Sequence, residues 1–177
     1  MKEIADTGLI VAFFHRNDPF HSWAAAAFRA QAPFFTCDAV LAEAGSFFPE
    51  PTGLLRLVAR GDLVLDPGFV LEKELPAVLA LATKYADRPM DLADACLVRM
   101  AELFPKSRIW TIDRSDFSTY RRNGRHMIPC EFPDSGARPR EKDESRARSG
   151  RFGIWSPRAG FPETCSNRHL TRRGASD

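Results

Sequence analysis

Residues 2–14 read KEIADTGLIVAFF and contain a short β-like run, an acidic turn and a long apolar stretch. The run at residues 2–5 is predicted as a strand, and the apolar stretch that begins at Leu9 is predicted as a helix. Residues 108–112, RIWTI, have the β-branched and aromatic composition of a buried strand, and Asp113 follows them directly. Both strands therefore end at an aspartate.

The residues between these two strands alternate in the same way. Further strands are predicted at 34–36, 63–65 and 127–132, and helices at 21–32, 39–48, 52–60, 69–85 and 91–104, with Asp38 as the N-cap of the helix that starts at Ala39. Strands separated by helices of this length indicate a parallel sheet with helices on both faces. We therefore expect an α/β fold, a three-layer α/β/α sandwich with a mostly parallel central sheet, over residues 1–132.

Composition sets limits on the kind of protein. The chain has 177 residues, of which 44% are hydrophobic, enough for one core. A net charge of +2 is too small to indicate a nucleic-acid or membrane partner by bulk charge. No apolar run reaches the length of a membrane span, and no signal-peptide pattern is present, so a cytoplasmic protein is expected. Four widely spaced cysteines indicate buried thiols rather than disulfides or a zinc site.

The composition changes near Pro133. Residues 133–177 are basic and rich in Ser, Gly and Arg, and from Asp134 onward their large aliphatic and Phe side chains are only Phe152, Ile154, Phe161 and Leu170. Such a segment buries too little apolar surface to offset the entropy of ordering it. It is predicted to be a disordered tail.

Four acidic side chains fall where the predicted fold would place a site. Asp6 and Asp113 follow strands, and ligands of open α/β sheets bind beyond the carboxyl ends of the strands. Asp94 lies next to the apolar stripe of its helix, and Glu43 is a lone acid in an apolar turn. Three of the four have a structural interpretation too: Asp6 and Asp113, like the nearby Asp91, as caps, and Glu43 as a solvent-facing side chain. Asp94 is harder to explain in this way, because an Asp next to the apolar stripe costs stability unless something uses its charge.

Carboxylates that converge at one edge repel one another, by ~3 kcal/mol for two charges about 5 Å apart at an effective dielectric constant of 20. A bound cation would offset this repulsion. Oxygen ligands without His or Cys favour Mg²⁺ or Mn²⁺. Such a site suits the attack of an activated water on a phosphodiester.

Four motifs in this order resemble the PIN-domain ribonucleases, specifically the VapC-like toxins. They are Asp6-Thr7-Gly8-Leu9-Ile10, Leu41-Ala42-Glu43, Met90-Asp91-Leu92-Ala93-Asp94-Ala95 and Thr111-Ile112-Asp113-Arg114-Ser115-Asp116-Phe117. The resemblance covers residues 2–132 and leaves the tail outside. It implies that Asp6, Glu43, Asp94 and Asp113 form an acidic site for Mg²⁺ or Mn²⁺. It also implies that Asp116 is a further acid of the site or a cap, and that Asp91 is a charge in the outer shell of the site. Thr7 would donate a hydrogen bond to a carboxylate or to a water on the metal.

The resemblance also implies a biological setting. The protein would be an endoribonuclease that hydrolyses RNA with an activated water, the toxin of a type II toxin–antitoxin pair, a homodimer, and the target of a small antitoxin. Apart from the resemblance, Arg114, Arg121, Arg122 and Arg125 follow Asp113 closely, which places them to meet RNA phosphates near the site, with a solvated face as the equal alternative. The rival is a catalytically silent RNA- or protein-binding module on the same fold. An aspartyl phosphatase would need Asp-x-Asp after the first strand, and position 8 is Gly.

Overall fold

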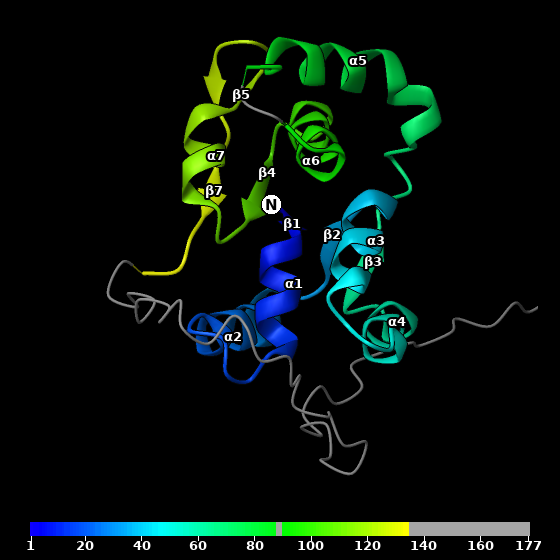
Figure 1. Ribbon diagram of the computed structural model, residues 1–177, viewed down its shortest axis with the longest axis vertical. Helices are drawn as coiled ribbons and strands as arrows, with labels where there is room; N and C mark the ends of the chain where they lie inside the picture. Colours follow the sequence, from blue (N-terminus) through cyan, green and yellow to red (C-terminus); the bar gives the residue numbers. More distant parts are fainter. Residues whose placement is uncertain (88–89, 135–177) are drawn as a thin grey trace, which may run out of the picture. The chain divides into compact units, whose positions relative to one another are not determined.

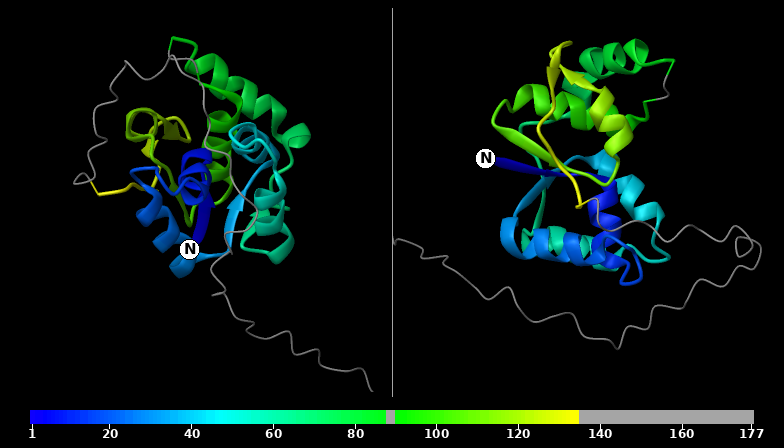
Figure 2. Two further views of the ribbon diagram at one scale, coloured as in Figure 1. Left: turned by 60° about the horizontal axis from the view of Figure 1, so that its bottom comes forward. Right: turned by 90° about the vertical axis from the view of Figure 1, so that its left-hand side faces the viewer.

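A five-stranded sheet forms the centre of the protein. The computed structural model describes residues 1–87 and 90–134. The strand order is β3-β2-β1-β4-β7, and every neighbouring pair is parallel. The strands are β1 (Lys2–Ala5), β2 (Phe34–Thr36), β3 (Leu63–Leu65), β4 (Ser107–Trp110) and β7 (Cys130–Glu131). Helices flank the sheet on both sides (Figures 1 and 2), so the predicted α/β/α sandwich is confirmed.

Seven helices are described, and capping residues account for several of their ends. They are α1 (Thr7–Phe14), α2 (His21–Gln31), α3 (Asp38–Ser46), α4 (Thr52–Arg60), α5 (Leu71–Lys84), α6 (Leu92–Leu103) and α7 (Arg114–Thr119). Gly61 ends α4 with a φ of 79°, in the left-handed region that favours glycine. Asp91 caps α6 by accepting a hydrogen bond from the backbone N–H of Asp94 at 2.7 Å, and α6 ends shortly before Pro105.

The predicted start of α3 is wrong by one residue. Asp38 lies inside the first turn of the helix, and the N-cap position belongs to Cys37, whose side chain makes no capping hydrogen bond. Aspartate is favourable both at the N-cap and in the first turn, where it interacts with the positive end of the helix dipole, so the sequence alone does not distinguish these two positions for Asp38.

The predicted strand at residues 127–132 is also wrong, because it is two strands. β6 (His126–Met127) pairs antiparallel with β5 (Arg121–Arg122) in a hairpin, whereas β7 joins the main sheet. Pro129 lies between them. It has no backbone N–H to donate, so a continuous ladder through this position is unfavourable.

The core lies on both faces of the sheet. Ile109 and Trp110 are adjacent in β4 and point to opposite faces. The ring of Trp110 lies 5.7 Å from that of Trp23, which brings α2 over this face. α6 lies on the other side of the strands (Figure 2) and is buried along most of its length, including Leu97 and Met100.

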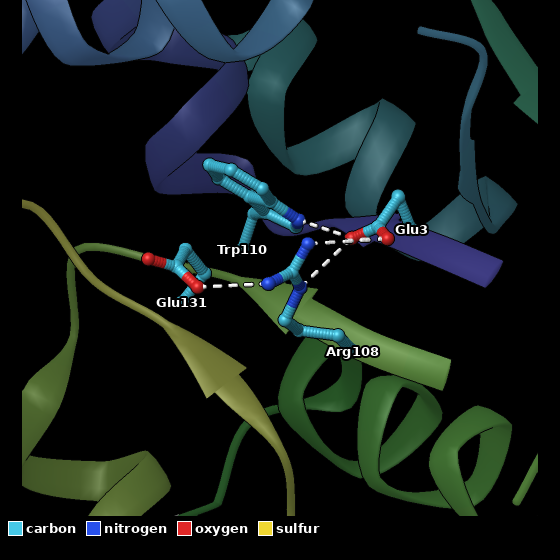
Figure 3. A network of polar contacts seen from close by, with 4 residues as sticks. All are labelled: Glu3, Arg108, Trp110 and Glu131. Carbon is cyan, nitrogen blue, oxygen red and sulfur yellow. Dashed lines mark hydrogen bonds and ion pairs between the residues drawn. The ribbon is translucent and has the colours of Figure 1, made fainter. Parts of the chain in front are cut away.

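A charged network ties together three adjacent strands (Figure 3). Glu3 of β1 is 8% exposed, and its Oε2 accepts hydrogen bonds from the indole N–H of Trp110 at 2.5 Å and from Nε of Arg108 at 3.0 Å. Arg108 also donates to Glu3 Oε1 through Nη2 and to Glu131 Oε2 of β7 through Nη1. The buried carboxylate is therefore fully paired.

The cysteines, the C-terminal residues and the lengths of the helices bear on three further expectations. Cys37 and Cys96 are buried free thiols as expected, Cys130 is half-buried, and Cys165 lies outside the described residues. The predicted tail also lies outside them, except for Pro133 and Asp134. In the part of the chain that the structure describes, no helix combines the length and apolar character that crossing a bilayer requires.

Candidate functional site

The acidic residues lie at the point where the strand order of the sheet reverses. From β1 the chain continues to β2 and β3 on one side, whereas β4 and β7 lie on the other. Asp6 follows β1, and its backbone N–H donates to the carbonyl of Trp110 at the end of β4. Asp6 and the segment after β4 therefore share the carboxyl edge of the two central strands, where α/β sheets bind ligands.

Asp6 is 7% exposed and holds two hydrogen bonds. Its Oδ1 accepts from the backbone N–H of Thr7 at 2.6 Å, which caps α1, and its Oδ2 accepts from the hydroxyl of Thr111 at 2.6 Å. Burial raises the pKa of Asp6 to about 6, although these two hydrogen bonds lower it, and the charges of Glu43 and Asp91 raise it further. Asp6 is thus both the predicted cap and an acid whose charge the fold makes unfavourable.

Glu43 reaches the same edge from α3. It is half-buried, and its Oε2 accepts a hydrogen bond from the hydroxyl of Thr7 at 2.7 Å, a carboxylate contact of the kind expected for Thr7. The first turn of α1 packs so closely against the segment after β4 that a Cβ on Gly8 would lie 2.5 Å from Cγ1 of Ile112. Only glycine fits at position 8 without a shift of Ile112.

Asp94 lies in the first turn of α6 and is half-buried. The hydroxyl of Tyr120 donates to its Oδ2 at 3.0 Å. Burial and then the charge of Asp91 raise the pKa of Asp94 to about 7, with smaller contributions from Asp6 and Asp116, while the hydrogen bond from Tyr120 lowers it. Asp91 is exposed and caps α6, so its structural interpretation is confirmed.

Asp113 is exposed, and its Oδ1 accepts from the backbone N–H of Asp116 at 2.9 Å, which caps α7. Its own backbone N–H donates to the hydroxyl of Thr111, which in turn donates to Asp6. Thr111 therefore links Asp113 to Asp6 without direct contact between the carboxylates. Asp116 is half-buried in the first turn of α7.

The structure brings the predicted acids to one edge but leaves them apart. Within residues 1–87 and 90–134, no three or more His, Cys, Asp or Glu side chains are gathered closely enough to hold a metal ion as they stand. The chemistry of the donors still fits a hard cation, since carboxylates and a threonine hydroxyl supply only oxygen. The raised pKa values of Asp6 and Asp94 also mean that their negative charges are uncompensated in the fold.

The predicted phosphate-binding arginines have local contacts. Arg114 lies over the ring of Phe132, 4.4 Å from its centroid, and donates to the carbonyl of Pro133. Arg121 donates to three carbonyls at the end of α7, and Arg122 donates to the carbonyl of Pro105. These contacts hold the guanidinium groups in place without opposing their charge.

Two site residues were missed by the sequence prediction. Thr111 is fully buried and connects Asp6 to Asp113, and Tyr120 is 2% exposed and contacts Asp94. Thr111 has a usable signal, because it belongs to the same strand-end segment as Asp113. No sequence pattern connects Tyr120 to Asp94, since they lie on different elements far apart in the chain.

A surface pocket of about 420 Å³ lies elsewhere, lined by Lys2, Phe104, Lys106 and their neighbours. Lys2 begins β1, so this pocket is at the opposite end of the strand from Asp6. The chain matches no known protein-family model and no curated protein. The end of the sheet that carries Asp6, Glu43, Asp94 and Asp113, the acidic edge, is therefore interpreted from its own geometry and from the sequence motifs.

Proposed function

We propose that this protein is a divalent-cation-dependent endoribonuclease of the PIN type, whose site consists of Asp6, Glu43, Asp94 and Asp113. The observation that carries the proposal is that Asp6 and Asp94, from separate elements, lie at the switch point of the sheet with raised pKa values, and that the charge of Asp6 contributes to the raised pKa of Asp94. Burying acidic groups in this way lowers stability unless something uses their charge.

The side chains around the acids are arranged to hold them in position. Thr7 orients Glu43, Thr111 orients Asp6, and Tyr120 orients Asp94, each through one hydroxyl hydrogen bond of 2.6–3.0 Å. When bound by the four acids, Mg²⁺ or Mn²⁺ would supply an activated water and offset the charge of the phosphate. One carboxylate can also accept the proton of the attacking water as a general base.

The biological setting is a proposal that rests on the sequence resemblance. It comprises the role of toxin in a type II toxin–antitoxin pair, a homodimer, a small antitoxin as inhibitor and a cytoplasmic location. Growth inhibition by the wild-type chain, but not by the Asp94→Asn variant, is the expected result in cells.

The direct test is cleavage of RNA by the purified full-length chain. We expect Mg²⁺-dependent cleavage of total RNA that EDTA abolishes, and a loss of roughly 100-fold or more in Asp6→Asn and Asp94→Asn, because each removes a cation-binding charge. Asp62→Asn is the matched control, since Asp62 lies just before β3, at the amino end of the strands, and pairs with Arg60 on the surface. Circular dichroism checks that the variants are folded.

Two outcomes would overturn the proposal. Cleavage at the wild-type rate in both site variants would remove the acids from the chemistry. Binding of RNA without cleavage under every divalent cation tried would instead identify the silent binding module on the same fold.

A further inference from the structure

A basic hairpin begins directly after the residue that contacts Asp94. Tyr120 donates to Asp94, and the next two residues form β5, which pairs with β6 in the register Arg121 to Met127 and Arg122 to His126. The loop between them turns at Asn123 and Gly124, which have φ values of 50° and 77°. The hairpin is thus fixed to the acidic edge through Tyr120.

The positive charges of the hairpin are not opposed by carboxylates. Arg121, Arg122 and Arg125 belong to it, and Lys84 of α5 approaches it with Nζ 3.5 Å from the carbonyl oxygen of Gly124. Across residues 1–87 and 90–134, none of these four cations forms an ion pair.

One acid does contact the hairpin, but its charge is already engaged. Glu102 accepts from the backbone N–H of Asn123 through Oε1, and its Oε2 pairs with Arg99 at 2.9 Å. The hairpin therefore keeps an excess of positive charge beside an acidic edge.

Two of the guanidinium groups are held in place by backbone carbonyls. Nη1 of Arg121 donates to the carbonyls of residues 118, 119 and 120 at 2.7–3.0 Å, and Nη1 of Arg122 donates to Pro105 at 3.0 Å. Among the described residues, Nε and Nη2 of both side chains have no hydrogen-bond partner. A guanidinium fixed in this way offers its remaining donors to phosphate oxygens at a low cost in side-chain entropy.

We propose that the hairpin of residues 121–127 is a binding strip for the phosphates of single-stranded RNA and directs the RNA strand to the acidic edge. The choice of RNA as ligand rests on the proposed function. Met127 is 69% exposed and lies opposite Arg121 in the hairpin. A cation next to an exposed, flexible apolar side chain suits a strand with unpaired bases, whose phosphates and base faces are both accessible.

The test measures binding separately from cleavage. A fluorescein-labelled oligouridylate of about 12 nucleotides is titrated with the full-length chain in EDTA, and the dissociation constant is measured by anisotropy over a series of salt concentrations. Arg122→Gln/Arg125→Gln should bind at least tenfold more weakly, and the slope of log K against log salt should fall by about 1.4, because each lost phosphate contact contributes about 0.7.

The matched control is Arg16→Gln/Arg29→Gln. It removes the same charge from two exposed arginines at and near α2, which lies far from the hairpin in Figure 1. The control should keep the wild-type slope and bind within about twofold of the wild type, because charges beyond a Debye length are screened.

An unchanged slope in Arg122→Gln/Arg125→Gln, or an equal loss in the control, would overturn the inference. So would a result in which the hairpin variant loses binding to poly-glutamate but keeps binding to oligouridylate, because the strip would then serve an acidic protein. Since hydrolysis plays no part in the assay, cleavage that survives Asp94→Asn would contradict the proposed function while leaving the binding result intact.

Discussion

Asp6 combines a structural role with a chemical one at a single side chain. As the cap of α1 it needs only an acceptor oxygen, which asparagine also provides. The full negative charge is therefore not required for capping. It is also unfavourable here, because burial raises the pKa of Asp6 from 3.8 to about 6. A residue that keeps a charge the fold disfavours is a candidate for a function that uses it.

The raised pKa of Asp6 predicts how stability depends on pH. Because the folded protein binds this proton more tightly than the unfolded chain does, the free energy of unfolding without cation falls as the pH rises from about 4 to about 6. The effect is on the order of 3 kcal/mol for a shift of this size. Asp6→Asn removes the effect but weakens one hydrogen bond, so at about pH 8 we expect a gain of about 1–2 kcal/mol.

Urea unfolding in EDTA at about pH 4 and about pH 8 measures this difference. At about pH 4 the carboxyl of Asp6 is neutral in the folded protein and partly neutral in the unfolded chain, where its pKa is 3.8, so most of the gain should disappear. Asp62→Asn should stay within about 0.5 kcal/mol of the wild type at either pH, because its ion pair is on the surface. A variant less stable than the wild type by the same amount at both values would contradict the raised pKa.

Sequence reasoning locates the acids better than it locates their partners. Asp6 and Asp113 could be predicted because they follow strands, and parallel strands end at a common edge. Tyr120 could not, since its hydroxyl reaches Asp94 only because the chain between α7 and β5 lies beside α6. A buried tyrosine looks like any other core aromatic in a sequence, and only the structure shows which atom its hydroxyl contacts.

At the scale of elements, the β1–β4–β7 arrangement depends on a charged network rather than on apolar packing alone. The side chains of Glu3, Arg108 and Trp110 point toward one another from neighbouring strands (Figure 3). A central strand with a glutamate is unexpected from hydrophobic patterning, because parallel strands buried on both faces are usually apolar. The pairing with Arg108 explains why Glu3 is tolerated.

The network predicts a specific loss of stability. Glu3→Gln keeps the size of the side chain but leaves Arg108 with only the more exposed Glu131, so we expect the free energy of unfolding to fall by about 2 kcal/mol. Glu50→Gln changes an exposed loop residue and should cost less than about 0.5 kcal/mol. Equal effects of the two substitutions in urea unfolding would show that the network contributes nothing to stability.

Most helices and strands could be predicted from periodicity and capping residues. The β5–β6 hairpin was not predicted, although the sequence contains a turn signal for it. Asn123-Gly124 is a strong indicator of a tight turn between two short strands, because both residues adopt positive φ readily. The prediction failed because each strand of this hairpin has only two residues, too few for a pattern of alternation.

For the whole molecule, the acidic edge and the basic hairpin are parts of one electrostatic arrangement. The acids repel one another at the end of β1 and at the starts of α6 and α7, and the hairpin places uncompensated cations just beyond Tyr120. A phosphodiester strand bound to the hairpin would bring further negative charge to the acids. On the proposed function, a divalent cation at this edge would offset the added repulsion.

Protons and a divalent cation should compete for this edge, which gives a prediction about the stability of the whole protein. At about pH 8 the acids are ionised, and Mg²⁺ at ten times its dissociation constant would stabilise the fold by about 1.4 kcal/mol, a rise in Tm of about 2–6 °C. At about pH 5 the pKa values of Asp6 and Asp94 leave both largely protonated, so the rise should be smaller. Thermal unfolding with Mg²⁺, against NaCl of equal ionic strength, measures both shifts. Asp94→Asn should lose most of the rise at about pH 8, and a rise that is the same at both pH values, or intact in that variant, would place the cation elsewhere on the protein.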